Sequence, residues 1–162
     1  MAALVRSGPI LIGYDGTRAS EHALREAAGL LGGRPALVVV VWKAGLAFEL
    51  LELPTSSVGL PPAPLDLRTA LETDRSLYEG AQRAAQQAAE LARALGLEAD
   101  ALTVAEEPDI SVAETLLRIA GERDAPAIVV GAHAHGGLLG STSRGVVRHA
   151  RCPVLVVREP SP

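Results

Sequence analysis

Short apolar runs alternate with longer segments of helical spacing along this chain, and that alternation restricts its fold more than any other feature. The first run, Pro9–Tyr14, ends in the turn Asp15–Thr17. Thr17 can cap a helix-like segment that follows to Leu31, and a second run covers Ala36–Trp42. Continuous apolar runs are typical of strands buried on both faces, and short connections through a helix make such strands parallel. The start of the chain therefore predicts a parallel sheet covered by helices.

The rest of the chain repeats this alternation. Ser111 and Glu114 form a capping box at the start of one helix, and Gly96 ends another. The predicted elements are strands at 99–104, 127–131 and 152–158 and helices at 68–95, 111–124 and 142–150. Five strands and four helices in this order predict a doubly wound α/β domain, a single five-stranded parallel sheet with helices on both faces. The less apolar strand 99–104 is expected at an edge.

Each predicted helix has an apolar face that is expected to pack on the sheet. The expected inward residues are Ala23, Ala27, Leu30 and Leu31 in the first helix, Leu71, Tyr78, Ala81, Ala85, Ala88, Ala92 and Leu95 in the second, Val112, Leu116, Ile119 and Ala120 in the third, and Val146, Val147 and Ala150 in the last.

The length of 162 residues fits one domain, residues 1–162. Prolines interrupt the segment 43–67, so we expect a loop there. Its leucines and Phe48 favour a short helix, a lid or a subunit contact, and a variable surface insertion is the alternative. The Pro-rich tail 158–162 is expected to fray.

Composition excludes several classes of partner. The net charge is -4 and aromatic residues make up 2% of the chain, which argues against nucleic acid as a partner. The longest strongly apolar run, Ala36–Trp42, is far shorter than the roughly 20 residues of a membrane-spanning helix. Met1–Gly8 has no secretory h-region, and the single cysteine, Cys152, suits a reducing compartment. We expect a cytoplasmic protein that binds neither nucleic acid nor membrane.

A glycine-rich loop joins the apolar run at Ala127 to the last predicted helix. It ends in Gly140, Ser141 and Thr142, directly before that helix. Glycine lets a backbone approach an anion closely, and a helix N-terminus favours negative charge. Ser141 either caps the helix or binds a phosphate oxygen. The loop thus indicates a phosphate site, or else only the strand, loop and N-cap of any α/β unit.

The motifs at both ends of the chain resemble the universal stress protein family. They are Ile10–Thr17 near the start, and Ile128–Gly131, Gly140-Ser141 and Cys152–Arg158 toward the end. The family's ATP-binding members carry Gly, two residues, Gly, nine residues, and then Gly with Ser or Thr. Here Ala134 stands at the second glycine, and five residues separate it from Gly140. The loop is therefore four residues shorter than that pattern.

The resemblance implies where an adenine nucleotide, ATP with its Mg²⁺, would bind. Asp15 and the Gly13 backbone would lie beside the adenine and ribose, and the main chain near Val41 would bind the adenine edge. Gly140, Ser141 and Thr142 would hold the phosphates at the last helix, and the first glycine of the pattern falls on Gly131. Apart from the resemblance, His133 of the same loop is a candidate to contact phosphate.

No catalytic set accompanies these residues. The chain lacks a Gly-x-Ser-x-Gly elbow and a Lys-containing P-loop, so we expect binding with at most slow ATP hydrolysis. His133 and His135 lack the further ligands of a metal site. Arg144, Arg148, His149 and Arg151 are interpreted as an exposed helix face, and Cys152 as a packed thiol.

The last strand predicts an assembly. Residues 153–157 carry apolar side chains on both faces with no charge to block pairing at a sheet edge. In the family this strand pairs across a two-fold axis, so the resemblance implies a homodimer. The sequence thus predicts a stress-response protein that binds ATP as a homodimer. The alternative is a dimeric protein-interaction module whose shortened loop binds no nucleotide, with protein partners that the sequence does not identify.

Overall fold

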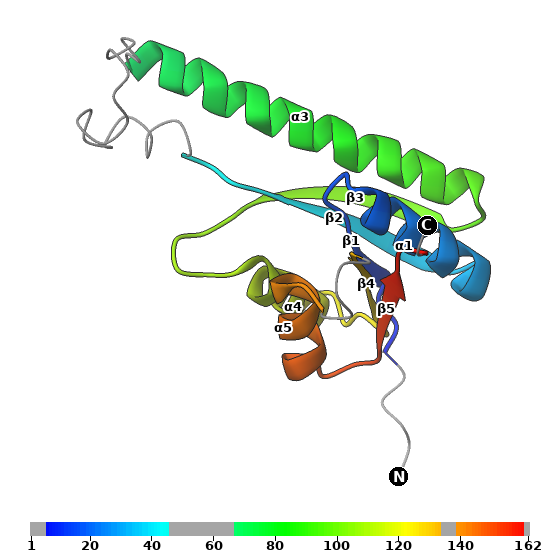
Figure 1. Ribbon diagram of the computed structural model, residues 1–162. Helices are drawn as coiled ribbons and strands as arrows, with labels where there is room; N and C mark the ends of the chain where they lie inside the picture. Colours follow the sequence, from blue (N-terminus) through cyan, green and yellow to red (C-terminus); the bar gives the residue numbers. More distant parts are fainter. Residues whose placement is uncertain (1–5, 46–66, 134–138, 161–162) are drawn as a thin grey trace.

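The computed structural model describes residues 6–45, 67–133 and 139–160, and Figure 1 traces the order of their helices and strands. Strands and helices alternate as the sequence predicted, and no boundary differs from its prediction by more than two residues. The strands are β1 (Ile10–Gly13), β2 (Pro35–Trp42), β3 (Glu98–Ala105), β4 (Ile128–Ala132) and β5 (Val154–Arg158). The helices are α1 (Arg18–Leu31), α3 (Leu67–Ala94), α4 (Val112–Glu122) and α5 (Ser141–His149). Most of the segment 43–67 lies outside the described residues, so its interpretation stays a prediction.

The strands form one parallel sheet with the order β3-β2-β1-β4-β5. The predicted doubly wound architecture and the edge position of β3 are both confirmed. From β1 the chain winds outward through β2 to β3, and then crosses to the other side of β1 to add β4 and β5. The strand order therefore reverses between β1 and β4, the position where open α/β sheets bind ligands.

Helices cover both faces of this sheet, with α1 and α3 on one side and α4 and α5 on the other (Figure 1). Alternate residues of each strand enter the two cores. Ile10 and Ile12 pack toward α1 and α3, whereas Leu11, Val39 and Val130 pack toward α4 and α5. This double burial explains why the central strands read as continuous apolar runs.

Two helices begin at the caps that the sequence predicted. The Thr17 hydroxyl accepts a hydrogen bond from the Ser20 N–H at 3.2 Å, one turn into α1. At α4, the Ser111 hydroxyl accepts from the Glu114 N–H, and the Glu114 carboxylate accepts from the Ser111 N–H at 2.8 Å. Both caps satisfy backbone donors that a helix start leaves open, so they fix where each helix enters the sheet layer.

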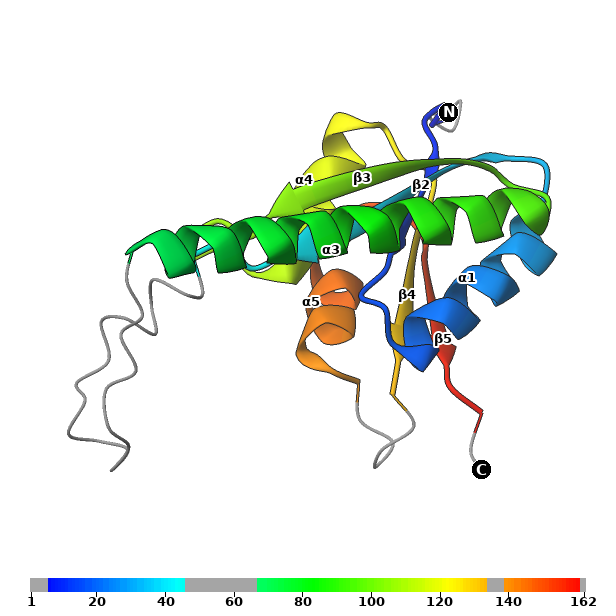
Figure 2. The same cartoon turned by 90° about the horizontal axis from the view of Figure 1, so that it is seen from above.

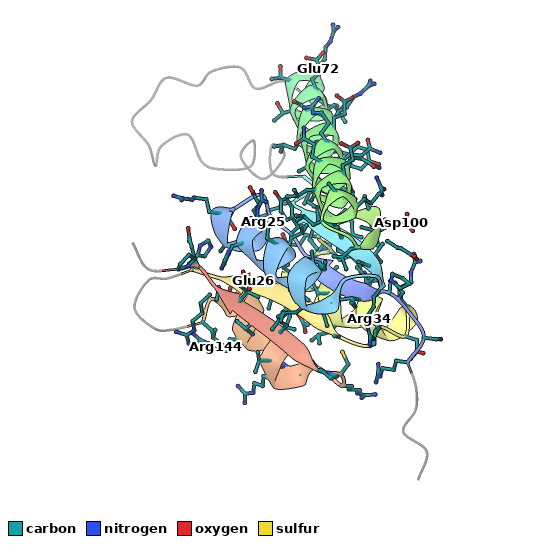
Figure 3. All side chains as sticks on the ribbon, turned by 90° about the vertical axis from the view of Figure 1, so that its right-hand side faces the viewer. Arg25, Glu26, Arg34, Glu72, Asp100 and Arg144 are labelled. Atoms are coloured by element: carbon teal, nitrogen blue, oxygen red, sulfur yellow. The ribbon has the colours of Figure 1, made fainter. Side chains whose placement is uncertain are left out.

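The helix α3 packs through alanines near its C-terminal end. Ala85, Ala88, Ala89 and Ala92 are buried there, and their small side chains let the helix lie close to the sheet. The first turns of α3 extend beyond the covered part of the sheet, as Figure 2 shows. In Figure 3 the side chains around Glu72, at this far end, point away from the rest of the molecule.

Several residues that were predicted to face the sheet are exposed instead. Leu71, Tyr78 and Leu95 of the α3 segment are exposed, although the Tyr78 ring still lies against Trp42 at the end of β2, at a centroid distance of 5.4 Å. Leu30 is 65% exposed, because the buried face of α1 is centred between the Ala23–Ala27 and Leu24–Ala28 rows. Val147 is exposed because α5 packs through Ser143 and Val146.

Candidate functional site

A cavity of about 170 Å³ lies where the strand order reverses, at the carboxyl ends of β1, β2 and β4. Its walls combine apolar side chains with a small number of polar groups, the composition typical of ligand pockets. The lining residues are Gly13, Tyr14, Asp15, Thr17, Ser20, Val39, Val41, Val112, Leu116, Val130, Gly131, His133 and Thr142.

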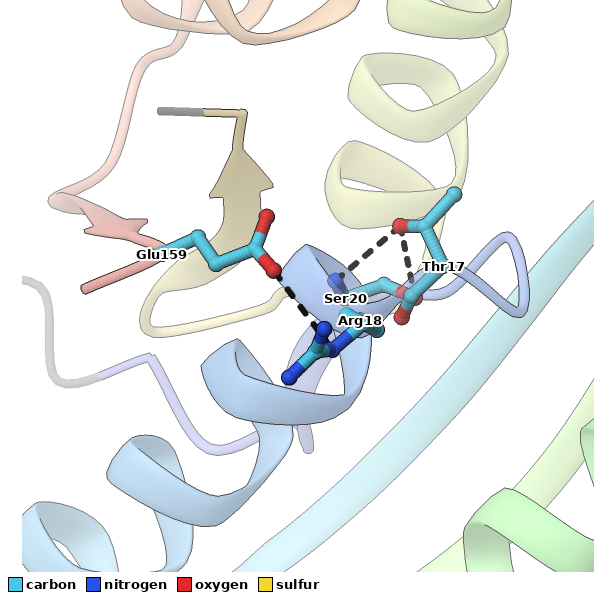
Figure 4. Close-up of polar contacts among 4 residues, drawn as sticks. All are labelled: Thr17, Arg18, Ser20 and Glu159. Atoms are coloured by element: carbon cyan, nitrogen blue, oxygen red, sulfur yellow. Dashed lines mark hydrogen bonds and ion pairs between the residues drawn. The ribbon is translucent and has the colours of Figure 1, made fainter. Parts of the chain in front are cut away.

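The polar wall of the cavity is built around the turn between β1 and α1. The Asp15 Oδ1 atom accepts hydrogen bonds from the Thr17 N–H at 3.0 Å and from the Thr17 hydroxyl at 2.6 Å. The Ser20 hydroxyl donates to the Thr17 carbonyl oxygen and accepts from the Asp15 N–H. Figure 4 shows Thr17 and Ser20 at the start of α1, beside the ion pair that the exposed Arg18 makes with Glu159. The helix cap and the cavity wall are therefore one hydrogen-bonded unit.

These contacts keep Asp15 ionised. Partial burial raises the pKa of the carboxyl, but hydrogen bonds from Thr17 and Ser20 and the electrostatic effect of His133 outweigh it, so the Asp15 pKa lies below its ordinary value. The neighbouring Tyr14 shows the opposite effect, since burial, Glu21 and Asp15 raise its pKa. At neutral pH the wall thus presents one carboxylate and a neutral phenol.

Six of the eight residues predicted for the site line this cavity. Gly13, Asp15, Val41, Gly131, His133 and Thr142 come together there from four separate segments. Gly140 and Ser141 do not line it. Gly140 is the N-cap of α5 without a side-chain hydrogen bond, and Ser141 is the first helical residue, so the predicted cap role of Ser141 is wrong.

The first glycine of the loop is required for packing within the protein. A Cβ atom at Gly131 would lie 2.5 Å from the Ala19 carbonyl oxygen and 2.9 Å from the Ser20 nitrogen, both backbone atoms of α1. The Ser143 hydroxyl of α5 also donates to the Gly131 carbonyl oxygen at 3.0 Å. Gly131 therefore joins β4 to the first turns of α1 and α5. Close packing explains why glycine is needed here, whereas the sequence analysis expected the loop glycines to allow close approach to an anion.

Sequence reasoning missed several lining residues. Thr17 was predicted only as a helix cap and Leu116 only as a core residue, yet both line the cavity. Tyr14, Ser20, Val39, Val112 and Val130 also line it. For Ser20 a signal existed, because a helix that starts at Thr17 turns the residue three positions later back toward Asp15.

The basic residues near α5 and Cys152 agree with their plainer interpretations, and His135 lies outside the described residues. Arg144, Arg148, His149 and Arg151 are all exposed. Burial raises the pKa of Cys152, which opposes a reactive thiolate. Among the described residues, no group of three or more His, Cys, Asp or Glu side chains is arranged to hold a metal ion, and no helix is long and apolar enough to cross a bilayer.

Comparison with known families gives one match. The model described as "Universal stress protein family" matches residues 109–158, which run from the end of the β3–α4 connection to the end of β5. The matched segment contains the glycine loop and the last strand, two of the motifs on which the resemblance was noted. The match agrees with the resemblance over this C-terminal part of the chain.

Solved structures with this fold cover nearly the whole chain. A universal stress protein family member from Burkholderia pseudomallei is 28% identical over 94% of this chain and 97% of its own, with a TM-score of 0.53. The universal stress protein from Archaeoglobus fulgidus in complex with dAMP is 21% identical over 94% and 98%, with a TM-score of 0.56. An Arabidopsis thaliana family protein with AMP bound is 12% identical over 95% and 93%, with a TM-score of 0.62.

Proposed function

We propose that this chain is a universal stress protein and that it binds an adenine nucleotide in the cavity at the ends of β1, β2 and β4. The observation that carries this proposal is the place of the cavity, between β1 and β4, where the strand order reverses. Relatives with the same fold have been solved with dAMP and with AMP. The position of the cavity, the residues that line it and the ligands of these relatives all support an adenine nucleotide as the ligand.

The lining suggests a role for each part of a nucleotide. Val39, Val41 and Leu116 offer an apolar surface to the base, while Asp15 offers a carboxylate oxygen to the ribose hydroxyls. The phosphate would lie toward Gly131, His133 and Thr142. Among the residues that the structure describes, no side chain caps α5 at Gly140, so the N–H groups around Ser141 and Thr142 can bind an anion.

Two finer features follow from the family resemblance. ATP with a bound Mg²⁺ is the nucleotide that the resemblance implies, and the edge strand β5 is the surface through which a homodimer would form. On this proposal the protein acts through nucleotide-dependent contacts with partners, and turnover is at most slow hydrolysis.

Calorimetric titration of the purified protein with adenine nucleotides tests the proposal. We expect micromolar affinity, a free energy of about -8 kcal/mol. Asp15→Ala and Thr142→Val should weaken binding, because one removes the ribose contact and the other removes a hydroxyl from the cavity wall on the phosphate side. Ser76→Ala, on the exposed side of α3 away from the cavity, is the control and should bind as the wild type does.

A second candidate function is a protein-interaction module that binds no nucleotide. It is favoured by the first half of α3, where Leu67, Leu71, Leu77 and Tyr78 are exposed. Clustered apolar side chains of this kind are typical of interaction surfaces. Absence of binding heat and of thermal stabilisation by nucleotides up to millimolar concentration would contradict the first proposal and leave this one.

A further inference from the structure

We propose that this protein has a second ligand site, which binds small organic phosphates in a basic pocket at the opposite end of the sheet from the nucleotide cavity. The basic pocket has a volume of about 490 Å³, and Arg6, Arg118, His149 and Arg151 are its basic lining residues. It shares no lining residue with the nucleotide cavity, so the two sites can be tested separately.

The basic pocket is built from separate segments at the amino ends of β4 and β5. Ile128, the first residue of β4, lines it, whereas Gly131, near the other end of the same strand, lines the nucleotide cavity. Arg6 precedes β1, Arg118 belongs to α4, and Arg151 lies in the connection from α5 to β5. The fold thus gathers three arginines that lie far apart in the sequence.

Two of these arginines carry a charge that no carboxylate balances directly. The Arg6 guanidinium donates to the carbonyl oxygens of Ala125 at 3.5 Å and of Arg151 at 3.1 Å. These acceptors are neutral, so they orient the guanidinium without removing its charge. Within the described ranges, no ion pair includes Arg6 or Arg151. The five residues that precede Arg6 contain no Asp or Glu.

The carboxylates near the basic pocket are mostly engaged elsewhere or too few. Glu107 and Glu122 pair with Arg118 at 2.9 and 3.9 Å, and neither lines the pocket. Among the described residues that line it, Asp124 is the one carboxylate, and it forms no ion pair with the basic lining residues. The two arginines without a carboxylate therefore outnumber it.

The helix ends near the basic pocket have cations of their own. A helix C-terminus carries about half a negative charge, and a basic residue close to it is favourable. Arg123 is the C-cap residue of α4 and Arg148 lies in the last turn of α5, and neither lines the pocket. The helix ends account for these two arginines, but they do not account for Arg6, which comes from the start of the chain.

The lining indicates the chemical class of the ligand. A guanidinium presents parallel N–H donors that match phosphate oxygens, and two guanidinium groups match the charge of about -2 that a phosphate monoester carries at neutral pH. The remaining wall includes the apolar side chains Leu117, Ala120 and Ile128. The volume of about 490 Å³ lies within the roughly 300 to 1,000 Å³ of small-molecule pockets, more than one phosphate group needs. The basic pocket therefore suits a phosphate group joined to a compact apolar body.

Phenyl phosphate, compared with inorganic phosphate and with phenol, tests this proposal on the full chain. In nitrogen-15 NMR titrations, phenyl phosphate should shift the amide signals of Gly121 and Cys152, which line the basic pocket, with a dissociation constant of roughly 1 mM or lower. Inorganic phosphate should bind about tenfold more weakly, because it buries no apolar surface. No shift of these signals up to about 10 mM, or equal affinity for the two phosphates, would overturn the proposal.

Two variants that remove the same charge distinguish a site from a diffuse positive field. Arg151→Gln should lower the affinity for phenyl phosphate about fivefold, because it removes a charged donor from the lining. Arg148→Gln is the matched control, since Arg148 is exposed and lies outside the lining, and it should bind as the wild type does. Equal losses in both variants would contradict a defined site. Asp15→Ala, in the nucleotide cavity, should leave phenyl phosphate binding unchanged, so failure of one site does not imply failure of the other.

Cys152 provides a second measurement, because it is the only cysteine in the chain and lines the basic pocket. Burial raises the pKa of its thiol, and the positive charge of Arg6 acts in the opposite direction. Saturating phenyl phosphate should slow alkylation of Cys152 by iodoacetamide, since the ligand covers the thiol and offsets the charge of Arg6. An alkylation rate that saturating phenyl phosphate leaves unchanged would place the ligand elsewhere and overturn the proposal.

Discussion

Asp15 is positioned before any ligand arrives. Its carboxylate is held by the amide and hydroxyl of Thr17, and Thr17 is in turn held by the first turn of α1. A ligand that binds this carboxylate does not have to immobilise the side chain. The conformational entropy of the Asp15 side chain has already been lost on folding, so it does not reduce the binding free energy. The same contacts lower the Asp15 pKa, so they also make folding stability depend on pH.

Replacing Thr17 with Val should raise the Asp15 pKa, because the hydroxyl that donates to the carboxylate is lost. A lowered pKa contributes stability that is present above the unfolded-state value and is lost as pH falls through the folded-state value. The variant should therefore lose stability at neutral pH, with about 1 kcal/mol from the helix cap alone, and show a weaker fall in acid.

Carbon-13 NMR titration of the Asp15 carboxyl and chemical denaturation at a series of pH values measure both effects. Thr17→Ser keeps a hydroxyl at this position and should keep the lowered pKa. An unchanged Asp15 titration in Thr17→Val would mean that the hydrogen bond at 2.6 Å does not govern this carboxyl.

At the residue scale, the sequence predicted those site residues whose position depends only on where a strand ends. Gly13 ends β1, Asp15 follows it, and Val41 lies one residue before the end of β2, so the parallel sheet alone brings them to one edge. It could not predict that Leu116 reaches the cavity from α4, because that depends on how closely the helix packs on Gly13, where a Cβ would lie 3.0 Å from Leu116 Cδ1. Distances of this kind are set by tertiary packing and leave no local pattern.

At the scale of elements, the closest packing in the site is between α1 and the end of β4. The backbone of α1 at Ala19 approaches Gly131 within the space that a methyl group would need. The helix α1 itself contains one glycine, Gly29, which is exposed and has no atom within 4 Å of a Cβ placed there. A methyl group therefore has no space at Gly131 of β4 but has space at Gly29 of α1.

Gly131→Ala should destabilise the fold by about 1 to 3 kcal/mol, because the added methyl group forces α1 away from β4. Gly29→Ala should stabilise it by up to about 1 kcal/mol, since alanine is the better helix former and meets no neighbour. Urea denaturation of both variants measures the difference. Equal effects in the two variants would contradict the close packing of α1 on β4.

The elements were predictable because their signals are local. Apolar runs, capping residues and glycines placed every boundary of the described strands and helices within two residues. The inward faces were predicted less well, since Leu30, Leu71 and Val147 are exposed. Periodicity shows that a helix has an apolar stripe, but it does not show where the sheet beneath that stripe ends.

At the scale of the whole molecule, β5 leaves one edge of the sheet open in the chain described here. The Pro153 carbonyl oxygen accepts from the Ile128 N–H, and the Glu159 N–H donates to the Ala132 carbonyl oxygen, so the odd-numbered residues of β5 turn their backbone groups toward β4. The even-numbered residues Val154 and Val156 turn theirs outward. Those outward groups are what a second copy of the strand would pair with.

If β5 forms the homodimer interface, Val156→Pro should yield a folded monomer, because proline removes an outward N–H without touching the bonds to β4. Leu155→Pro should instead damage the sheet itself, since that N–H faces β4. Sedimentation velocity gives the mass, and circular dichroism shows whether each variant is folded. A wild-type protein that sediments as a monomer, or a Val156→Pro variant that stays dimeric, would exclude this interface.

The central place of β1 has a consequence for the growing chain on the ribosome. This strand pairs with β2 soon after it is made, but its other neighbour, β4, begins at Ile128. Until then one backbone edge of β1 has no strand to pair with. The sheet face that carries Leu11 and Val39 is not covered until α4 has been made. A nascent chain that has not yet reached β4 therefore exposes an unpaired strand edge and an apolar sheet face. A truncated product released at this stage should aggregate instead of forming a stable fragment.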